Sequence, residues 1–175
     1  MSYNNNAKGN QWNKPAGGNS NKTEVYKVNY EKLNDDNYVE IAEEVLLSFK
    51  KEEENSKNNA NNRRNNNFEI VTTTQIRNLL AMISDIYNDV VTPGSTEGNS
   101  DKLNGDITKR INYLKVRIVY DSGREKNVKN FFDRANISKY LDDVIKSKSK
   151  TDFILFSRYM EALVAYRKFY FEEDK

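Results

Sequence analysis

Residues 102–122, KLNGDITKRINYLKVRIVYDS, place apolar side chains three or four positions apart. The apolar positions are Leu103, Ile107, Ile111, Leu114 and Ile118. Because an α-helix turns by about 100° per residue, these side chains lie on one face. The segment is therefore predicted to be an amphipathic helix with one buried face. Gly123 follows it, in a position where a glycine commonly ends a helix.

Further segments show the same helical period. They run from Asp36 to about Lys51, from about Thr73 to Val91, from about Arg124 to Ala135, from about Ser138 to Lys146 and from about Asp152 to Tyr170. No segment from residue 34 onward alternates strictly over a sustained run. The fold class is therefore predicted to be all-α, a bundle of five to six helices. An α+β fold stays open if residues 23–30 or 68–71 pair as strands.

Local signals mark some of the helix ends. Thr72 and Gln75 fit a capping box at the start of the second helix, and Thr151 or Asp152 can cap the last helix. The C-terminal segment also carries more aromatic rings than one core face needs. These rings, Tyr159, Tyr166, Tyr170 and Phe171, are predicted to lie either in the core or against a partner.

Asparagine is concentrated at the front of the chain, where residues 1–67 hold 18 of the 26 asparagines. Residues 1–33 are predicted to be a disordered tail, because they offer little apolar surface to bury. Within this tail, residues 23–33 could instead form a short strand or dock on the surface. Residues 55–67, NSKNNANNRRNNN, are predicted to be a low-complexity insertion after the first helix. Residues 34–175 then form a single helical domain.

The chain of 175 residues contains no His and no Cys. Disulfides, zinc sites built from these residues and catalysis by Ser-His-Asp or Cys-His arrangements are therefore excluded. No apolar run approaches the roughly 20 residues that a membrane span needs. The segment MSYNNNAKGNQWNKPAGGNSNK lacks the apolar core of a secretory signal. We expect a cytoplasmic protein that makes no membrane contact.

The net charge of +2 conceals a basic block. Residues 102–150 carry thirteen Lys and Arg against six acids, whereas residues 68–101 carry one against five. On the helix over residues 102–122, a face interleaves cations with tyrosines, and the charge continues past Gly123. Such cations neutralise phosphates, and tyrosines stack on unpaired bases. A solvated helix has a similar pattern, however, and the pattern alone favours that plainer interpretation.

Several segments, in order and spacing, resemble the small subunit of the type III-A CRISPR effector, the Csm complex. They are YLKVRIVYDSGRE at residues 113–125, YMEALVAYRKFY at 159–170, TTTQIRNLLAMISDIYN at 72–88 and DNYVEIAEEVL at 36–46. The resemblance covers residues 34–51 and 70–171. One departure is Phe171 with Glu172 and Glu173, where many members of the family have glycines.

The resemblance implies an all-helical, non-catalytic subunit that stacks head to tail in several copies along the channel for guide RNA and target RNA. It implies contacts with the RNA backbone that do not select sequence, and contacts with the other subunits of the complex. It carries Lys115, Arg117 and Arg124 over from the YLKVR…GR motif and Arg77 from QIR as RNA-binding residues. The basic face adds Lys109, Lys126 and Lys129. No catalytic residue, metal or cofactor is expected.

Two other classes of function stay open. A pure protein–protein assembly module would use its helix faces without touching RNA. A nuclease built on Asp, Glu and Lys would need carboxylates that converge on a metal ion. The adjacent pairs Asp35–Asp36 and Asp142–Asp143 are predicted instead to be caps or surface residues, because neighbouring helical positions do not converge.

Overall fold

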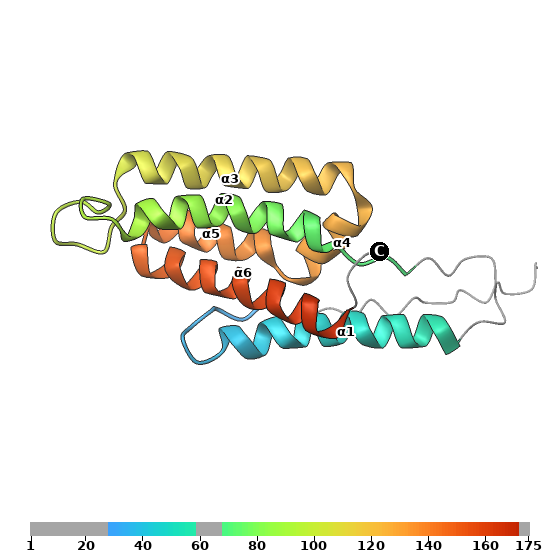
Figure 1. Cartoon of the computed structure of the whole chain (residues 1–175). Helices are drawn as coiled ribbons and strands as arrows, with labels where there is room; N and C mark the ends of the chain where they lie inside the picture. Colours follow the sequence, from blue (N-terminus) through green and yellow to red (C-terminus); the bar gives the residue numbers. More distant parts are fainter. Residues whose placement is uncertain (1–27, 59–67, 172–175) are drawn as a thin grey trace, which may run out of the picture.

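The computed structural model describes residues 28–58 and 68–171, and these residues form six α-helices (Figure 1). The helices are α1 (Tyr38–Asn58), α2 (Thr73–Val91), α3 (Gly105–Arg124), α4 (Lys126–Arg134), α5 (Ile137–Ser147) and α6 (Lys150–Tyr170). No strand occurs among the described residues, which include 28–30 and 68–71. The predicted all-α bundle is confirmed, and the α+β alternative is wrong for the described part of the chain.

α2 has the limits that its sequence predicts. Gln75 donates its backbone N–H to Thr72 Oγ1 at 3.2 Å, and Thr72 donates its own backbone N–H to Gln75 Oε1 at 2.8 Å. This reciprocal capping box satisfies N–H groups at the start of the helix that have no partner within it. Thr92 ends the helix in an extended conformation before Pro93, because the proline ring disfavours helical backbone in the residue before it.

α3 is shifted relative to its predicted limits. Asn104 caps it, since its Oδ1 accepts the backbone N–H groups of Asp106 at 3.1 Å and Ile107 at 3.0 Å. Gly123 stays within the helix, which ends where Glu125 takes extended backbone with φ of −133°. The prediction that Gly123 ends the helix is wrong, because a helix-ending glycine takes left-handed backbone and Gly123 does not.

α1 is longer than predicted. It runs to Asn58, into the segment predicted to be an insertion, while residues 59–67 lie outside the described part of the chain. Lys50 and Lys57 both pair with Glu53, at 3.0 Å and 2.7 Å, along the last turns. Ion pairs three and four residues apart stabilise an exposed helix, so α1 continues beyond its buried stripe.

α6 is the central helix of the bundle. It packs against α1, α2 and α5, so apolar side chains on several of its faces are buried. The buried apolar set is Phe153, Leu155, Phe156, Tyr159, Met160 and Leu163. Tyr159 donates its hydroxyl to the Ala135 carbonyl at 2.9 Å inside the core, so the core alternative holds for this ring. Ser149, not Thr151 or Asp152, caps the helix and accepts the Asp152 N–H at 3.0 Å.

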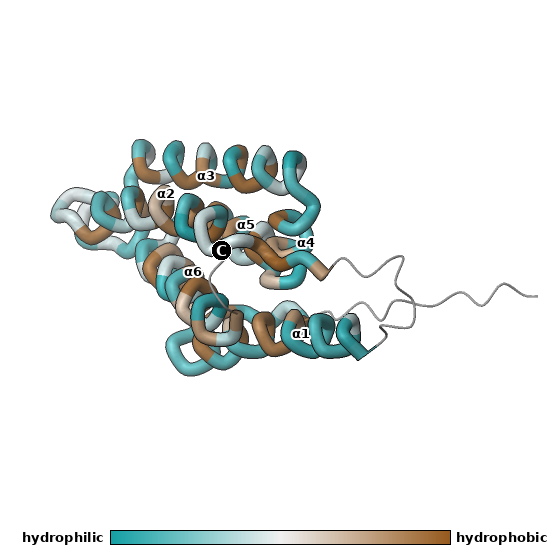
Figure 2. The backbone as a smooth tube through the Cα atoms, turned by 45° about the vertical axis from the view of Figure 1, so that its right-hand side comes forward, coloured by the Kyte–Doolittle hydropathy of each residue, from teal (hydrophilic) through white to brown (hydrophobic). Residues whose placement is uncertain are grey.

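α3 and α1 lie at opposite edges of the bundle. Figures 1 and 2 both show α3 along one edge and α1 along the other, with α2, α5 and α6 between them. α3 packs against α2, α4 and α5, whereas α1 packs against α6. The buried side chains of α3 are Ile107, Ile111, Leu114 and Ile118. The predicted apolar stripe of α3 is confirmed, and the remaining faces of this helix are open to solvent or to ligands.

Residues 28–33, which belong to the predicted tail, lie against the bundle without forming a strand. The Tyr30 ring lies 5.3 Å from the Tyr140 ring, and the Tyr30 hydroxyl donates to Asp143. This hydrogen bond, together with burial, raises the pKa of Tyr30 to about 12. Of the two alternatives for residues 23–33, the described part, residues 28–33, therefore docks on the surface of the bundle and does not form a strand. Residues 1–27 lie outside the described part of the chain.

Asp101 ties the loop between α2 and α3 to the turn between α5 and α6. Its carboxylate accepts the Thr151 N–H at 3.1 Å, the Thr151 hydroxyl at 2.9 Å and the Ser149 hydroxyl. Its carbonyl accepts the Lys150 N–H at 2.8 Å. Burial acts to raise the pKa of Asp101, but the hydrogen bonds from Ser149 and Thr151 outweigh it and hold the pKa below its usual range. The loop therefore closes one end of the bundle.

Replacing Asp101 with Asn is expected to lower the free energy of unfolding at pH 7 by about 1 kcal/mol, because charge-assisted hydrogen bonds at a partly solvated site are lost. A carboxylate whose pKa falls on folding stabilises the fold above its unfolded pKa, about 3.9, and loses this contribution as the pH falls through the folded pKa. The difference between wild type and Asp101→Asn should therefore shrink in acid.

Urea unfolding of both proteins between about pH 7 and pH 3 measures this difference. Glu161→Gln removes an exposed acid from the middle of α6 and is the matched control. A gap between wild type and Asp101→Asn that widens in acid would contradict the role given to this carboxylate.

Candidate nucleic-acid interface

α3 presents different residues on its two flanks. Arg117 and Arg124 line a hollow on the flank toward α2. Lys115 lies on the other flank and donates to Asp142 of α5. Two residues along a helix amount to a rotation of about 200°, so Lys115 and Arg117 do not share a surface. The structure separates two residues that the sequence motif had placed together.

The groove between α2 and α3 consists of two adjoining hollows. They measure about 430 Å³ and about 450 Å³, and both are lined by Met82 and Arg117. Ile86 and Leu114, both buried, contribute to the first hollow. Arg124 lines the second. The groove thus combines an apolar floor with guanidinium groups at its rim.

Arg110 joins α3 to α2 beside the first hollow. Its guanidinium pairs with Asp85 at 2.6 Å and also with Asp89. These acids compensate the charge of Arg110, which therefore acts as a brace between the two helices. Arg110, one of the cations of the predicted basic face, therefore stabilises the packing of α3 on α2 and is less available to a ligand.

Tyr120 lies between two guanidinium groups. The guanidinium carbons of Arg117 and Arg124 each lie 5.6 Å from the centre of its ring, within the range of a cation–π contact. Within residues 28–58 and 68–171, no carboxylate forms an ion pair with either arginine. Tyr120 itself is 52% exposed. The end of α3 therefore holds two arginines without an ion-pair partner in the described ranges around an accessible aromatic ring, in a hollow that Asp121 and Glu125 also line.

The other predicted cations fall into two groups. Lys109, Lys115 and Lys129 pair with Asp106, Asp142 and Asp133 respectively. Arg77 and Lys126 are exposed, and neither forms an ion pair with another described residue. The Lys109–Asp106 pair spans 3.0 Å between side chains that are 80% and 91% exposed, so it contributes little and a phosphate can replace the acid. Arg77 does not line the groove, whereas its neighbour Asn78 does.

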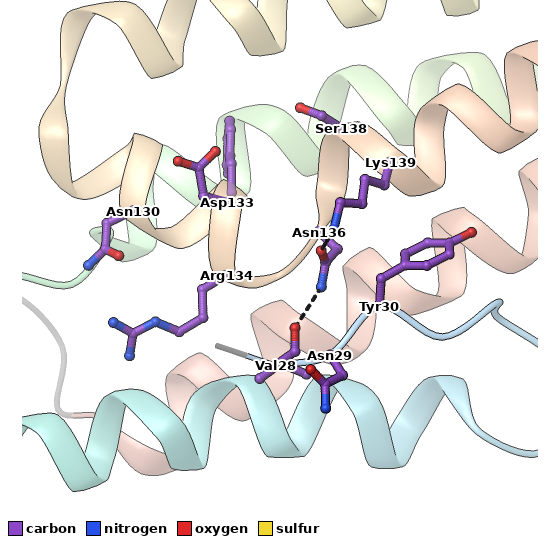
Figure 3. Close-up of a pocket in the computed structure, with 10 residues that line it drawn as sticks. Val28, Asn29, Tyr30, Asn130, Asp133, Arg134, Asn136, Ser138 and Lys139 are labelled. Carbon is purple, nitrogen blue, oxygen red and sulfur yellow. Dashed lines mark hydrogen bonds between the residues drawn. The ribbon is translucent and has the colours of Figure 1, made fainter. Parts of the chain in front are cut away.

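A separate hollow, of about 550 Å³, lies between residues 28–30 and the corner where α4 meets α5 (Figure 3). The Val28 carbonyl accepts a hydrogen bond from Asn136 Nδ2 at 3.1 Å on one side of it. Arg134 also lines it, but pairs with Glu52 at 2.6 Å and lies 3.8 Å from the Phe49 ring. Arg134 is therefore held by α1, while Lys139, which also lines the hollow, donates to Asn136 Oδ1 at 2.9 Å.

Most residues on the α2 side of the groove were not predicted from the sequence. Met82, Asp85 and Ile86 line it, whereas Arg77 was the only residue of α2 predicted to bind RNA. An apolar residue beside a buried stripe looks like core in the sequence, so Met82 and Ile86 gave no separate signal. Residues 68–101 carry more acidic than basic residues, and this excess indicated that α2 could supply ion-pair partners for the basic block.

Two of the acids predicted to be caps or surface residues form ion pairs on the surface. Asp35 pairs with Arg158 at 3.1 Å and Asp142 with Lys115, in line with the surface role predicted for these carboxylates. Within residues 28–58 and 68–171, no three acidic side chains gather as a metal site. The helices of these ranges are also too short or too polar for any of them to span a membrane.

Comparison with known proteins assigns the family. The model of one family, described as Csm2 Type III-A, matches residues 47–173, which is more than half of the chain. The chain belongs to the Csm2 Type III-A family. The small subunit that the sequence segments resemble is thereby confirmed as the family of this protein.

Curated members of the Csm2 family agree with this assignment, and each is named CRISPR system Cms protein Csm2. The Streptococcus thermophilus protein is 36% identical over 142 residues, which are 81% of this chain and 98% of that protein. The Enterococcus italicus protein is 39% identical over 103 residues, 59% of this chain and 70% of that protein. The Mycobacterium tuberculosis protein is 35% identical over 108 residues, 62% of this chain and 81% of that protein. Membership of the family supports a structural subunit of a type III-A CRISPR complex.

The brace between α2 and α3 can be measured with a double-mutant cycle of Arg110→Ala and Asp89→Ala. We expect a coupling energy of about 0.5–1 kcal/mol at low salt, because the pair is partly exposed. The coupling should decrease in about 1 M salt, where charges are screened within a few ångströms. Urea unfolding of the four proteins gives the value. The exposed Lys109–Asp106 pair provides a control with a smaller coupling, and additive single-mutant effects at low salt would contradict the brace.

Proposed function

We propose that the protein is a non-catalytic, RNA-binding structural subunit of a type III-A CRISPR ribonucleoprotein in the cytoplasm. It contacts the backbone of the guide RNA and the target RNA and takes part in antiviral defence. Its partners are the other subunits of the Csm complex and further copies of itself. The family supports the general role of a structural subunit. The surface of α3 supports the contact with RNA.

The observation that carries the RNA contact is the pair of arginines around Tyr120 at the end of α3. Arg117 and Arg124 flank Tyr120 without an acid partner among the described residues. Guanidinium groups bind phosphate through paired N–H donors, and release of counterions from RNA favours the association. Such contacts carry no base information, which suits a complex in which guide pairing selects the target.

The remaining candidate residues divide by their place in the fold. Lys109 lies on the same flank of α3 as Arg117 and lines the groove, so it extends the proposed surface. Lys126 and Arg77 supply exposed charge without an acid partner in the described chain. Lys115 instead pairs with α5 on the opposite flank, and we assign it to the stability of the fold. Lys129 pairs with Asp133 on the exposed side of α4, and we assign it a secondary role in RNA binding.

A surface far from α3 suits the contact between copies. Phe169, near the end of α6, is 77% exposed and lies 5.0 Å from the Tyr170 ring. Val39 and Leu47 of α1 are exposed as well. Exposed apolar side chains of this size mark protein interfaces. Because α1 and α3 lie at opposite edges of the bundle, a neighbouring copy and an RNA strand can be bound together (Figure 1).

The alternative is a protein–protein assembly module without RNA contact. The exposed ring of Phe169 favours assembly, but assembly gives no reason for two unpaired arginines around Tyr120. A metal-dependent nuclease would need free carboxylates near the RNA. Asp85, Asp121 and Glu125 line the groove, but Asp85 is committed to Arg110, and no three acids of the described residues gather as a metal site. RNA binding without chemistry therefore accounts for more of the surface.

The test of this function is the double variant Arg117→Ala/Arg124→Ala in the assembled complex. We expect weaker retention of target RNA, because two phosphate contacts are lost. The slope of log affinity against log salt should fall by about one unit for each lost contact. RNA retention and its salt dependence are measured on complexes purified with their native partners.

The matched control is Lys115→Ala/Lys57→Ala, which removes the same charge from lysines that are ion-paired within the fold and lie outside the proposed surface. This control should keep most of the salt slope. Equal RNA affinity and equal slope in wild type and Arg117→Ala/Arg124→Ala would overturn the RNA surface. If the wild-type complex retains no RNA at all, the assembly-module alternative replaces the proposed function.

A further inference from the structure

The hollow beside Tyr113 has features that contacts with a phosphate backbone do not use. It measures about 430 Å³, a size typical of small-ligand sites. Met82 lines it together with Ile86 and Leu114, which are buried. Tyr113 also lines it and is 64% exposed, so its ring is accessible. An aromatic wall beside an apolar floor suits a flat ligand that can stack.

Cations lie on both sides of Tyr113 along α3. Lys109 precedes it by four residues and Arg117 follows it by four, so each is displaced by roughly 6 Å along the helix axis. Among the described residues, Lys109 pairs with Asp106 alone, in an exposed pair, and Arg117 has no ion-pair partner. Arg110, the third cation of this hollow, is neutralised by α2. The charge that is available to a ligand therefore flanks the ring.

We propose that this hollow binds one unpaired nucleobase of an RNA strand, with the base against the Tyr113 ring and the neighbouring phosphates on Lys109 and Arg117. The inference rests on the proposed RNA-binding function and adds a base site to the backbone contact. Every base has a π-face, so such stacking tolerates any sequence. A base within a duplex is already paired and stacked. The site therefore selects single-stranded over double-stranded RNA without selecting a sequence.

An amphipathic protein helix is the other occupant whose shape would fit the groove. A helix would have to bring an acid to each of Lys109 and Arg117, at the spacing set by α3. An RNA strand brings a phosphate on either side of every base, which matches the order Lys109, Tyr113, Arg117 directly. Charge complementarity therefore favours the nucleic acid.

The experiment uses the full-length protein and a short single-stranded RNA that carries one iodouridine, a base that crosslinks under ultraviolet light to an aromatic side chain stacked on it. The crosslink in the wild type should map to Tyr113 by mass spectrometry. Tyr113→Ala should lose this crosslink and bind the single strand roughly 5- to 100-fold more weakly, with unchanged affinity for a duplex of the same sequence. Tyr113→Phe keeps the ring and should retain both properties.

Val116→Ala is the control for loss of exposed apolar surface on α3, and it should behave as the wild type. Equal single-strand affinity and crosslinking in Tyr113→Ala and the wild type would overturn the base site. The proposed function would then still stand if Arg117→Ala/Arg124→Ala weakens RNA binding. Loss of a co-purifying subunit from Tyr113→Ala with intact RNA binding would assign the hollow to a protein helix and overturn the proposal. Absence of RNA binding by the wild type, alone and in the complex, would overturn both proposals.

Discussion

The bundle depends on the burial of α6. Its apolar side chains point to several sides, so no single neighbouring helix can cover them, and α1, α2 and α5 each cover a part. Arg167, only 1% exposed, donates to the Val71 carbonyl at 3.0 Å and fixes the segment before α2 to this helix. Because α6 occupies the centre of the bundle, α3 lies at an edge, where a single apolar stripe is enough to pack it against its neighbours.

This position links the fold to the function. An edge helix can use its remaining faces for ligands without disturbing the core. The flank toward α2 is braced at Arg110, so the groove beside it has a defined width, and the groups along it are spaced by the helix itself. A rigid element of this kind holds Tyr113, Arg117 and Arg124 in fixed register, as the proposed contact with an RNA strand requires.

The sequence predicted those parts of the structure that local chemistry decides. The capping box at Thr72 gave the limits of α2, and the spacing of apolar residues gave the buried face of α3. It failed where a tertiary partner decides. No residue near Lys115 in the sequence indicates that it pairs with Asp142. Only the structure shows which cations form ion pairs within the fold and which are available to a ligand. Helical spacing did contain part of the answer, since it already turns Lys115 away from Arg117.

The arginines around Tyr120 have a thermodynamic consequence for the subunit. Among the described residues neither Arg117 nor Arg124 forms an ion pair, so an anion that binds them adds contacts that the free protein lacks. An anionic ligand that binds only the folded chain therefore stabilises the fold, by an amount that grows with the ligand concentration relative to its dissociation constant. With the RNA contact that we propose, RNA is a folding ligand as well as a partner. The free subunit would then be the least stable form of the molecule, and incorporation into a ribonucleoprotein would also be the step that completes its stability.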